Sequence, residues 1–148
     1  MSILFINASP NKNGNTAQLA KVLLAGKEHE TLNLIDCKIY AYGQDFADDQ
    51  FGQVIERIRK ADTVVMGSPL YWHNICGLLR NLLDRCYGRV NEGEFAGKNL
   101  YFVLQGAAPE EWQLKACEFT MSRFARLYGF AYKGMVTNVR QAKAVAGK

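Results

Sequence analysis

A polar loop near the start of the chain has the residue types of a phosphate-binding site. An apolar run at residues 3–6 is followed by a loop rich in Ser, Asn, Gly and Thr over residues 7–16, and then by an apolar pattern with helical spacing. Such a loop offers hydroxyl groups, side-chain amides and backbone N–H groups, and the positive end of the helix dipole lies at the same place. The pattern predicts that this loop holds a phosphate group.

A second loop, at residues 67–74, is predicted to place aromatic rings beside that site. Pro69 gives the loop a rigid bend, and Tyr71 and Trp72 supply two aromatic side chains. Flat aromatic ligands need such an apolar or stacking surface. The chain contains neither G-x-G-x-x-G nor G-x-x-x-x-G-K-S/T, which argues against a dinucleotide held in the Rossmann manner and against a P-loop nucleotide site. A phosphate cradle beside an aromatic wall instead suits flavin mononucleotide, FMN.

Alternating strand and helix patterns are expected to position these loops. Strands are predicted at residues 2–7, 32–35, 63–66, 99–104 and 132–136, and helices from Asn15, from the Asp48-Asp49 pair, over 75–86 and over 110–128. Repeated units of this length favour right-handed crossovers and a parallel sheet. We therefore expect one flavodoxin-like α/β domain over residues 1–148, a three-layer sandwich with a five-stranded parallel sheet in order 2-1-3-4-5. Its C-terminal helix is expected to be short or missing.

This strand order brings three polar loops to one edge of the sheet. They follow the first, third and fourth predicted strands, at residues 7–16, 67–74 and 105–109. Ligands of such sheets bind at the carboxyl ends of the strands, where the strand order reverses. The expected convergence is a stronger indication of a site than any single loop.

The overall composition favours a small anionic ligand over nucleic acid or a membrane. The 148 residues carry a net charge of +4, and the basic residues are scattered along the chain. No run approaches the ~18 apolar residues that a membrane span needs, and no charged leader precedes a long apolar stretch. We therefore expect a cytoplasmic protein with no membrane or nucleic-acid partner.

Several reactive residues have ordinary structural interpretations that stay open at this point. Ser9 and Thr16 could serve only as turn and helix-capping residues, and Tyr71 and Trp72 only as packing aromatics. A lone loop histidine such as His73 is more often incidental than catalytic, so no side chain is assigned a catalytic role. The four cysteines lack C-x-x-C spacing, so we expect buried free thiols and no metal site. They are Cys37, Cys76, Cys86 and Cys117.

Two motifs resemble the NADPH-dependent FMN reductase family of flavodoxin-like proteins. The first is Ser9-Pro10 followed by Gly14-Asn15-Thr16, and the second runs from Ala61-Asp62 through Gly67-Ser68-Pro69-Leu70-Tyr71-Trp72 to Gly77-Leu78-Leu79-Arg80-Asn81-Leu82-Leu83-Asp84-Arg85. The resemblance extends from residue 1 to about residue 136. It implies that the first loop contacts the FMN phosphate through Ser9, Asn11, Lys12, Asn15 and Thr16. It implies that the other two loops flank the isoalloxazine ring through Pro69, Leu70, Tyr71, Trp72, His73, Gly106 and Ala107.

The resemblance also implies an activity. An FMN-dependent NAD(P)H oxidoreductase would pass hydride from NAD(P)H through FMN to a flavin, quinone, nitro or azo acceptor, with the chemistry supplied by the cofactor. Members of the family are commonly dimers, so a homodimer is expected. The alternative is a flavodoxin, an electron carrier with no substrate of its own. Flavodoxins are typically strongly acidic, so the net charge of +4 favours the reductase.

The chain departs from the resemblance at two places. Iron–sulfur flavoproteins, which are relatives, carry a compact cysteine cluster between the second strand and the second helix, whereas residues 37–47 contain one cysteine. An iron–sulfur cluster is therefore not expected. Only about ten residues follow the last predicted strand, so we expect part of one sheet face to stay uncovered, with a partner subunit burying it.

Overall fold

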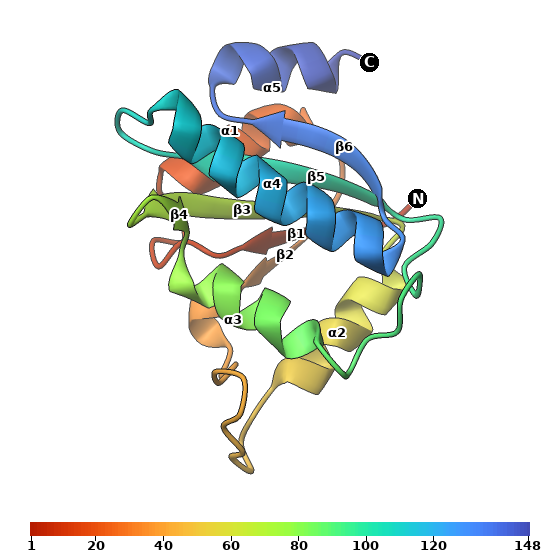
Figure 1. The fold of residues 1–148 in the computed structure, drawn as a ribbon. Helices are drawn as coiled ribbons and strands as arrows, with labels where there is room; N and C mark the ends of the chain where they lie inside the picture. The colour runs from red at the N-terminus through yellow and green to blue at the C-terminus, as the bar shows by residue number, and fades with distance from the viewer.

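A parallel five-stranded sheet forms the centre of the structure, a computed structural model that describes residues 1–148 (Figure 1). Its strands are β1 (Ile3–Asn7), β2 (Glu30–Asn33), β3 (Thr63–Tyr71), β5 (Asn99–Gln105) and β6 (Ala131–Val136). They lie in the order β2-β1-β3-β5-β6, which confirms the predicted order 2-1-3-4-5. The two-residue strand β4 (Asn74–Ile75) pairs antiparallel with the end of β3.

The central strands are apolar because both of their faces are covered. Phe5 of β1 pairs in register with Val65 of β3, and both side chains belong to one core cluster. Their neighbours Ile6 and Met66 also pair in register, and they point to the opposite face and join the other cluster. All four are at most 3% exposed. This alternation is the period-two pattern of a strand buried on both sides.

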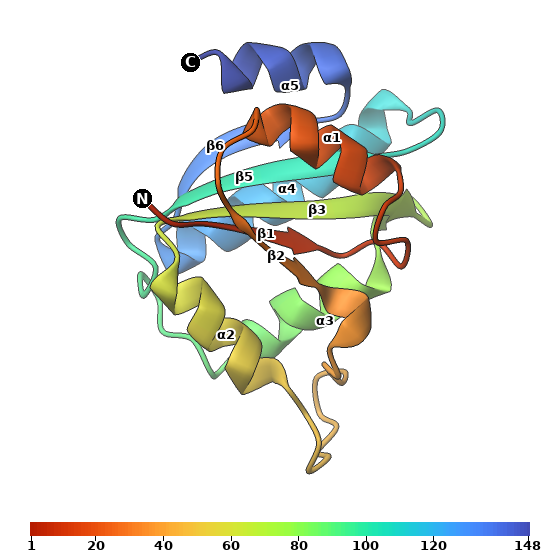
Figure 2. The same cartoon turned by 180° about the vertical axis from the view of Figure 1, so that it is seen from behind.

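Helices cover the two faces unequally. The helices α2 (Phe51–Lys60), α3 (Gly77–Cys86) and α4 (Glu111–Tyr128) pack on one face, where the core cluster contains 28 buried residues. The helices α1 (Asn15–Leu24) and α5 (Val139–Ala146) cover the other face, seen in Figure 2, with a cluster of 10. Most of the hydrophobic stabilisation therefore lies on the α2–α4 side. None of these helices is long and apolar enough to cross a membrane.

The C-terminal helix α5 is short, as expected. It spans eight residues and begins at an N-cap, Asn138, whose side chain accepts a hydrogen bond from the backbone N–H of Gln141. Ala142 of this helix is fully buried against the cluster that contains Val103 and Val136. A cavity of about 470 Å³ remains between α1, α5 and the sheet, so the covering of this face is incomplete. The sheet face that was expected to stay partly uncovered is therefore covered by α1 and α5 except at this cavity.

Three predicted boundaries of strands and helices are wrong, and each difference has a physical reason. Residues 34–36 form a 3-10 turn rather than the end of the second strand, because the edge strand β2 pairs only with β1 and that pairing ends at Asn33. Strand β3 continues to Tyr71, because β4 pairs with residues that were expected to form a loop. The N-cap of α2 is Gln50, because the carboxylates of Asp48 and Asp49 bind other partners.

Candidate functional site

The carboxyl ends of β1, β3 and β5 bring the three polar loops together. The backbone N–H of Ala8 donates to the carbonyl of Gly67 at 2.8 Å, and the thiol of Cys76 donates to the carbonyl of Ala8 at 3.3 Å. The third loop lies against the second, since a Cβ atom placed on Gly106 would come within 3.2 Å of Leu70 Cδ2. The expected convergence of the loops at one edge is therefore present.

The first loop holds its shape through its own hydrogen bonds. The side-chain oxygen of Asn7 accepts from the N–H of Ser9 at 3.1 Å, and Ser9 Oγ accepts from the N–H of Asn11 at 3.1 Å. Asn11 Oδ1 accepts in turn from the N–H of Asn13 at 3.2 Å. Each of these bonds closes a local turn of the kind that Asn and Ser form with the backbone. The loop is thus ordered by its own side chains.

The helix that follows this loop begins with unsatisfied donors. The N-cap of α1 is Gly14, and no side chain caps the helix. The first N–H groups of a helix have no intrahelical partner, so an uncapped first turn offers them to a ligand. Thr16 lies in this turn and is 3% exposed, and Ser9, seven positions earlier in the chain, is 6% exposed. Such an N-terminus binds phosphate well because its dipole and its donors point the same way.

Two glycines make room for this arrangement. A Cβ atom on Gly67 would lie 2.9 Å from Thr16 Cγ2, and one on Gly14 would lie 2.9 Å from the side-chain carbon Asn11 Cγ. Real Cβ atoms do not approach other heavy atoms so closely, so larger residues would displace both side chains. The residues present therefore fit a phosphate group at the start of α1.

The other residues predicted to contact the phosphate, Asn11, Lys12 and Asn15, are exposed, unlike Ser9 and Thr16. Asn11 and Asn15 are exposed at the surface of the loop. The ammonium group of Lys12 lies 2.7 Å from the carboxylate of Asp36, and both side chains are about half exposed. An exposed ion pair of this kind contributes at most ~1 kcal/mol to stability. Lys12 is therefore directed toward the segment that follows β2.

The second loop is a tight hairpin with a strained turn. Trp72 and His73 form the turn between β3 and β4, and both have positive φ angles, 47° and 68°. Hairpin turns with positive φ at both central residues normally contain Asn-Gly. Bulky residues in this region cost on the order of 1 kcal/mol each, and such strain is typical of ligand-binding segments.

The residues expected to line the flavin ring do not share one environment. Pro69 is buried and Leu70 is half-buried, whereas Tyr71 is 48% exposed and Trp72 is 93% exposed. In the third loop Gly106 is half-buried, next to Leu70 as described above, and Ala107 is exposed. Leu70 and Gly106 therefore form the inner part of the candidate ring site.

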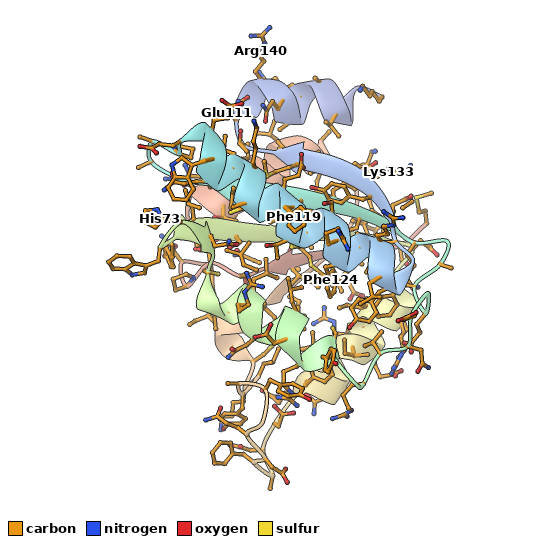
Figure 3. All side chains as sticks on the ribbon, viewed as in Figure 1. His73, Glu111, Phe119, Phe124, Lys133 and Arg140 are labelled. Atoms are coloured by element: carbon orange, nitrogen blue, oxygen red, sulfur yellow. The ribbon has the colours of Figure 1, made fainter.

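The hairpin turn contacts the start of helix α4. His73 Nδ1 lies 2.6 Å from the side-chain nitrogen of Gln113, and the ring of His73 lies 5.0 Å from that of Trp112 (Figure 3). Neither α4 residue was expected to take part in the site, because each has the pattern of an ordinary helix residue. This contact is the main feature of the site that sequence patterns did not reveal.

Two buried polar residues that were not predicted as site residues organise the loops. Asn7 is fully buried, and its amide donates to the carbonyl of Lys12 at 3.3 Å and to Asn33 Oδ1 at 3.2 Å. Ser68 is also fully buried, and its hydroxyl donates to the carbonyl of Pro69 at 2.7 Å while accepting from the N–H of Cys76 at 3.0 Å. A buried polar residue at the end of an apolar strand is the signal that could have identified both.

The largest cavity lies elsewhere. It measures about 900 Å³ and lies between the C-terminal halves of α3 and α4, with Tyr87, Arg126 and Tyr128 among its lining residues. Helix C-termini carry negative partial charge, which disfavours a phosphate. The loop edge, with its uncapped helix N-terminus, is therefore the better candidate for an anionic cofactor.

All four cysteines are free thiols, as expected. Burial raises the pKa of Cys86 to about 12 and that of Cys117 to about 11, so both thiols stay protonated and unreactive at neutral pH. Cys37 is half-buried and follows β2. No group of three or more His, Cys, Asp or Glu side chains is arranged to hold a metal ion.

Comparisons with known proteins agree with the features above. Residues 1–129 match the profile of the NADPH-dependent FMN reductase family. An iron-sulfur flavoprotein of Archaeoglobus fulgidus is 35% identical over 98 residues, which cover 57% of this chain and 48% of that protein. An iron-sulfur flavoprotein of Methanocaldococcus jannaschii is 28% identical over 101 residues, with 57% and 51% covered. The chain thus spans about half the length of these curated relatives.

Solved structures share the fold along nearly the whole chain. The Trp repressor binding protein of Bacillus subtilis superposes with a TM-score of 0.79 at 19% identity, covering 97% of both chains. An FMN-dependent NADH-azoreductase of Bacillus anthracis in complex with FMN gives 0.72 at 16% identity, covering 99% of this chain and 94% of that one. At these identities the likeness shows the flavodoxin-like fold alone.

The family match covers most of the chain and includes both motifs of the candidate site. The match confirms the expected cofactor, FMN. The names of these two relatives mention an iron–sulfur cluster, and residues 37–50 of this chain contain one cysteine, Cys37. By its sequence, this chain belongs to the NADPH-dependent FMN reductase family.

Proposed function

We propose that this chain is an FMN-dependent NAD(P)H oxidoreductase that passes reducing equivalents to a small-molecule acceptor. The observation that carries the proposal is the uncapped N-terminus of α1, together with the hydroxyl groups of the buried residues Ser9 and Thr16. It lies at the same sheet edge as the β3–β4 hairpin. Family membership supports the same function.

The first loop would hold the phosphate of FMN. The hydroxyl groups of Ser9 and Thr16 and the free N–H groups of the first turn of α1 would donate hydrogen bonds to its oxygens. Gly14 and Gly67 keep the space that these donors need. Asn11 and Asn15 would complete the cradle from its exposed side. Each hydrogen bond to a charged phosphate is worth about 1.5–3 kcal/mol, so a few of them suffice to anchor the cofactor.

The second and third loops would flank the ring. Pro69 and Leu70 offer an apolar surface, Tyr71 and Trp72 offer aromatic faces, and Gly106 allows the backbone to approach a flat ligand closely. When bound, FMN supplies the hydride and electron transfer between the nicotinamide and the acceptor. The chain itself would orient the ring and stabilise charge on its polar edge through backbone N–H groups.

The proposed acceptors are small planar oxidants such as flavins, quinones, nitro compounds or azo compounds. An azoreductase among the structural neighbours is consistent with this class. We also propose that two copies of the chain associate. The exposed apolar side chains Tyr87, Phe119 and Leu127, on and beside α3 and α4, support an association through that side of the molecule.

Titration and turnover test this proposal together. Added FMN should bind with a change in flavin fluorescence, and the loaded protein should oxidise NADPH or NADH when an acceptor from this panel is present. Absence of FMN binding at micromolar concentration would refute the proposal. Binding without NAD(P)H oxidation by any acceptor would instead indicate a flavodoxin-type electron carrier.

A further inference from the structure

The turn of the β3–β4 hairpin is held from two sides by helix side chains. From α3, the guanidinium of Arg80 donates to Asn74 Oδ1 at 3.4 Å. From α4, the side-chain nitrogen of Gln113 lies 2.6 Å from His73 Nδ1. The turn held by these contacts contains Trp72 and His73, whose φ angles are both positive. External contacts of this kind are needed because the strained turn would otherwise relax.

The capping box of α4 determines the direction of the hydrogen bond to His73. The backbone N–H of Glu110 donates to Gln113 Oε1 at 2.8 Å, so the oxygen of this amide faces Glu110 and the nitrogen faces the histidine. An amide nitrogen can only donate, so His73 Nδ1 accepts. The neutral imidazole of His73 then carries its proton on Nε2.

The other histidine of the chain has the opposite tautomer. His29 Nδ1 lies 2.9 Å from the carbonyl oxygen of Lys27. A carbonyl oxygen only accepts, so Nδ1 of His29 carries the proton when the ring is neutral. The two histidines are the only ones in the chain. His29 is therefore an internal reference for any measurement on His73.

A tryptophan ring tilted against the imidazole completes the contact between the hairpin and α4. The rings of His73 and Trp112 lie 5.0 Å apart at an interplanar angle of 39°. The indole N–H of Trp112 donates to the carboxylate of Glu110, which belongs to the same capping box. One edge and one face of the imidazole are thus fixed by the first turn of α4.

We propose that Gln113 is a positioning residue for the cofactor site. It joins the capping box of α4 to His73 and thereby holds the turn of the β3–β4 hairpin in the conformation described above. The inference rests on the proposed function, in which this hairpin flanks the flavin ring. A hairpin that is already ordered loses less conformational entropy when the cofactor binds, so the cofactor binds more tightly.

Two substitutions of Gln113 distinguish its contact with His73 from its part in the capping box of α4. Gln113→Met removes both the donor to His73 and the acceptor for Glu110, and we expect FMN binding to weaken about three- to tenfold. Gln113→Glu keeps an acceptor for the Glu110 N–H, as the usual capping-box residue does. Its second oxygen can accept from His73 once the ring proton moves to Nδ1. We therefore expect Gln113→Glu to restore most of the FMN affinity.

A matched control comes from helix α5. Gln141 is also an N3 residue, and its side-chain oxygen accepts from the backbone N–H of Thr137 at 2.8 Å, with no contact to the hairpin. Gln141→Met should lower the melting temperature about as much as Gln113→Met does but leave the FMN dissociation constant unchanged. Equal loss of FMN affinity in both variants would show a general effect of helix capping and would refute the proposal.

Nitrogen-15 NMR of the imidazoles tests the contact without any variant. At pH 8, long-range spectra of the full chain should show His73 protonated at Nε2 and His29 at Nδ1. In Gln113→Glu the proton of His73 should move to Nδ1 while His29 stays unchanged. A wild-type His73 protonated at Nδ1 would overturn the proposed hydrogen bond.

The outcomes also separate this proposal from the proposed function. If the wild-type protein binds no FMN, the proposed function fails whatever the tautomer of His73. If the wild type binds FMN and Gln113→Met binds it equally well, with the same KM for the acceptor, the positioning role fails and the proposed function stands. Weaker FMN binding by Gln113→Met, rescue by Gln113→Glu and a moved proton on His73 would establish the role.

Discussion

The loops that follow the neighbouring strands β1 and β2 use their polar groups in opposite ways. Residues 8–14, after β1, carry hydroxyl and amide side chains and lead into α1; neither α1 nor α2, which follows the second segment, has a side-chain cap. Residues 37–50, after β2, are closed by ionic and hydrogen-bonded contacts within the chain. The first loop is shaped by hydrogen bonds among uncharged residues, whereas an arginine–carboxylate pair closes the second.

The second of these segments is fixed chiefly by one ion pair. Arg85 of α3 donates to both carboxylate oxygens of Asp49, at 2.8 and 2.7 Å, and to the carbonyl of Tyr40 at 3.0 Å. Its guanidinium also lies 4.9 Å from the ring centroid of Phe51. A bidentate pair with such support is geometrically specific. The long segment is therefore held to α3 without regular secondary structure.

The difference shows how the two kinds of polar loop can be recognised. Both contain residues with turn and capping propensity, and both follow a parallel strand at the same edge of the sheet. They differ in what closes them: Arg85 of α3 binds Asp49 in the second segment, whereas hydrogen bonds between its own residues shape the first. Hydroxyl-bearing residues at the N-terminus of a helix indicate an anion site, whereas a bidentate pair indicates a structural contact.

The largest effect is expected from breaking the structural segment. Arg85→Leu would leave the mostly buried carboxylate of Asp49 without its partner, and we expect the free energy of unfolding to fall by about 3 kcal/mol. Urea denaturation measures this loss. Lys38→Leu removes the exposed pair with Asp48 in the same segment and should lower stability far less than Arg85→Leu does. Equal losses in both variants would contradict the central role of Arg85.

Breaking the ligand loop should have the converse effect. Combining Ser9→Ala with Thr16→Val removes two hydroxyl donors, and we expect FMN affinity to fall about 100-fold with little change in unfolding free energy. Fluorescence titration gives the affinity and urea denaturation the stability. Asn13→Ala, in the same loop, is the control and should keep the wild-type affinity. A stability loss without an affinity loss would make Ser9 and Thr16 structural residues only.

Acid should weaken the structural segment selectively. The guanidinium of Arg85 lowers the pKa of Asp49 to about 2 in the folded protein, below its ordinary value near 4. The stabilisation is fully present above about pH 4 and is lost as the pH falls toward 2, by about 2 kcal/mol in total. Asp49→Asn should lose this part of the pH dependence. An unchanged slope between pH 4 and 2 in that variant would assign the acid sensitivity to other carboxyl groups.

The smallest effect is expected from substituting Lys12, in the loop after β1. Its ammonium group pairs with Asp36 rather than pointing into the first loop. Lys12→Met should therefore change FMN affinity less than about threefold and stability by less than about 1 kcal/mol. A tenfold or larger loss of FMN affinity would show that Lys12 leaves Asp36 and binds the phosphate directly.

Sequence patterns predicted the features that depend on local spacing. The apolar periodicity predicted the strands and the four longer helices, and the alternation of strands and helices favoured the flavodoxin-like strand order that the structure has. The Ser, Asn and Thr content of residues 7–16 located the candidate phosphate loop. Contacts between distant segments were not predictable in this way. The pairs Lys12–Asp36 and His73–Gln113 join different loops and helices, and only the folded chain brings them together.

The exposure of individual side chains could not be predicted from the sequence pattern either. Trp72 has the residue type of a stacking surface, yet the hairpin turn leaves it 93% exposed, because a two-residue turn directs its central side chains outward. The second strand ended early since no neighbour continues beyond Asn33. Both outcomes depend on which strands pair, and the pairing register is a property of the whole sheet.

The central claim is that the loop after β1 holds the phosphate of FMN. Parallel titrations of the wild-type protein with FMN and with riboflavin, which has the same ring but no phosphate, test it most directly. We predict that FMN binds about 100-fold or more tightly than riboflavin, because the hydroxyl groups and the free N–H groups at α1 act only on the phosphate. Equal affinity for the two flavins would contradict the account.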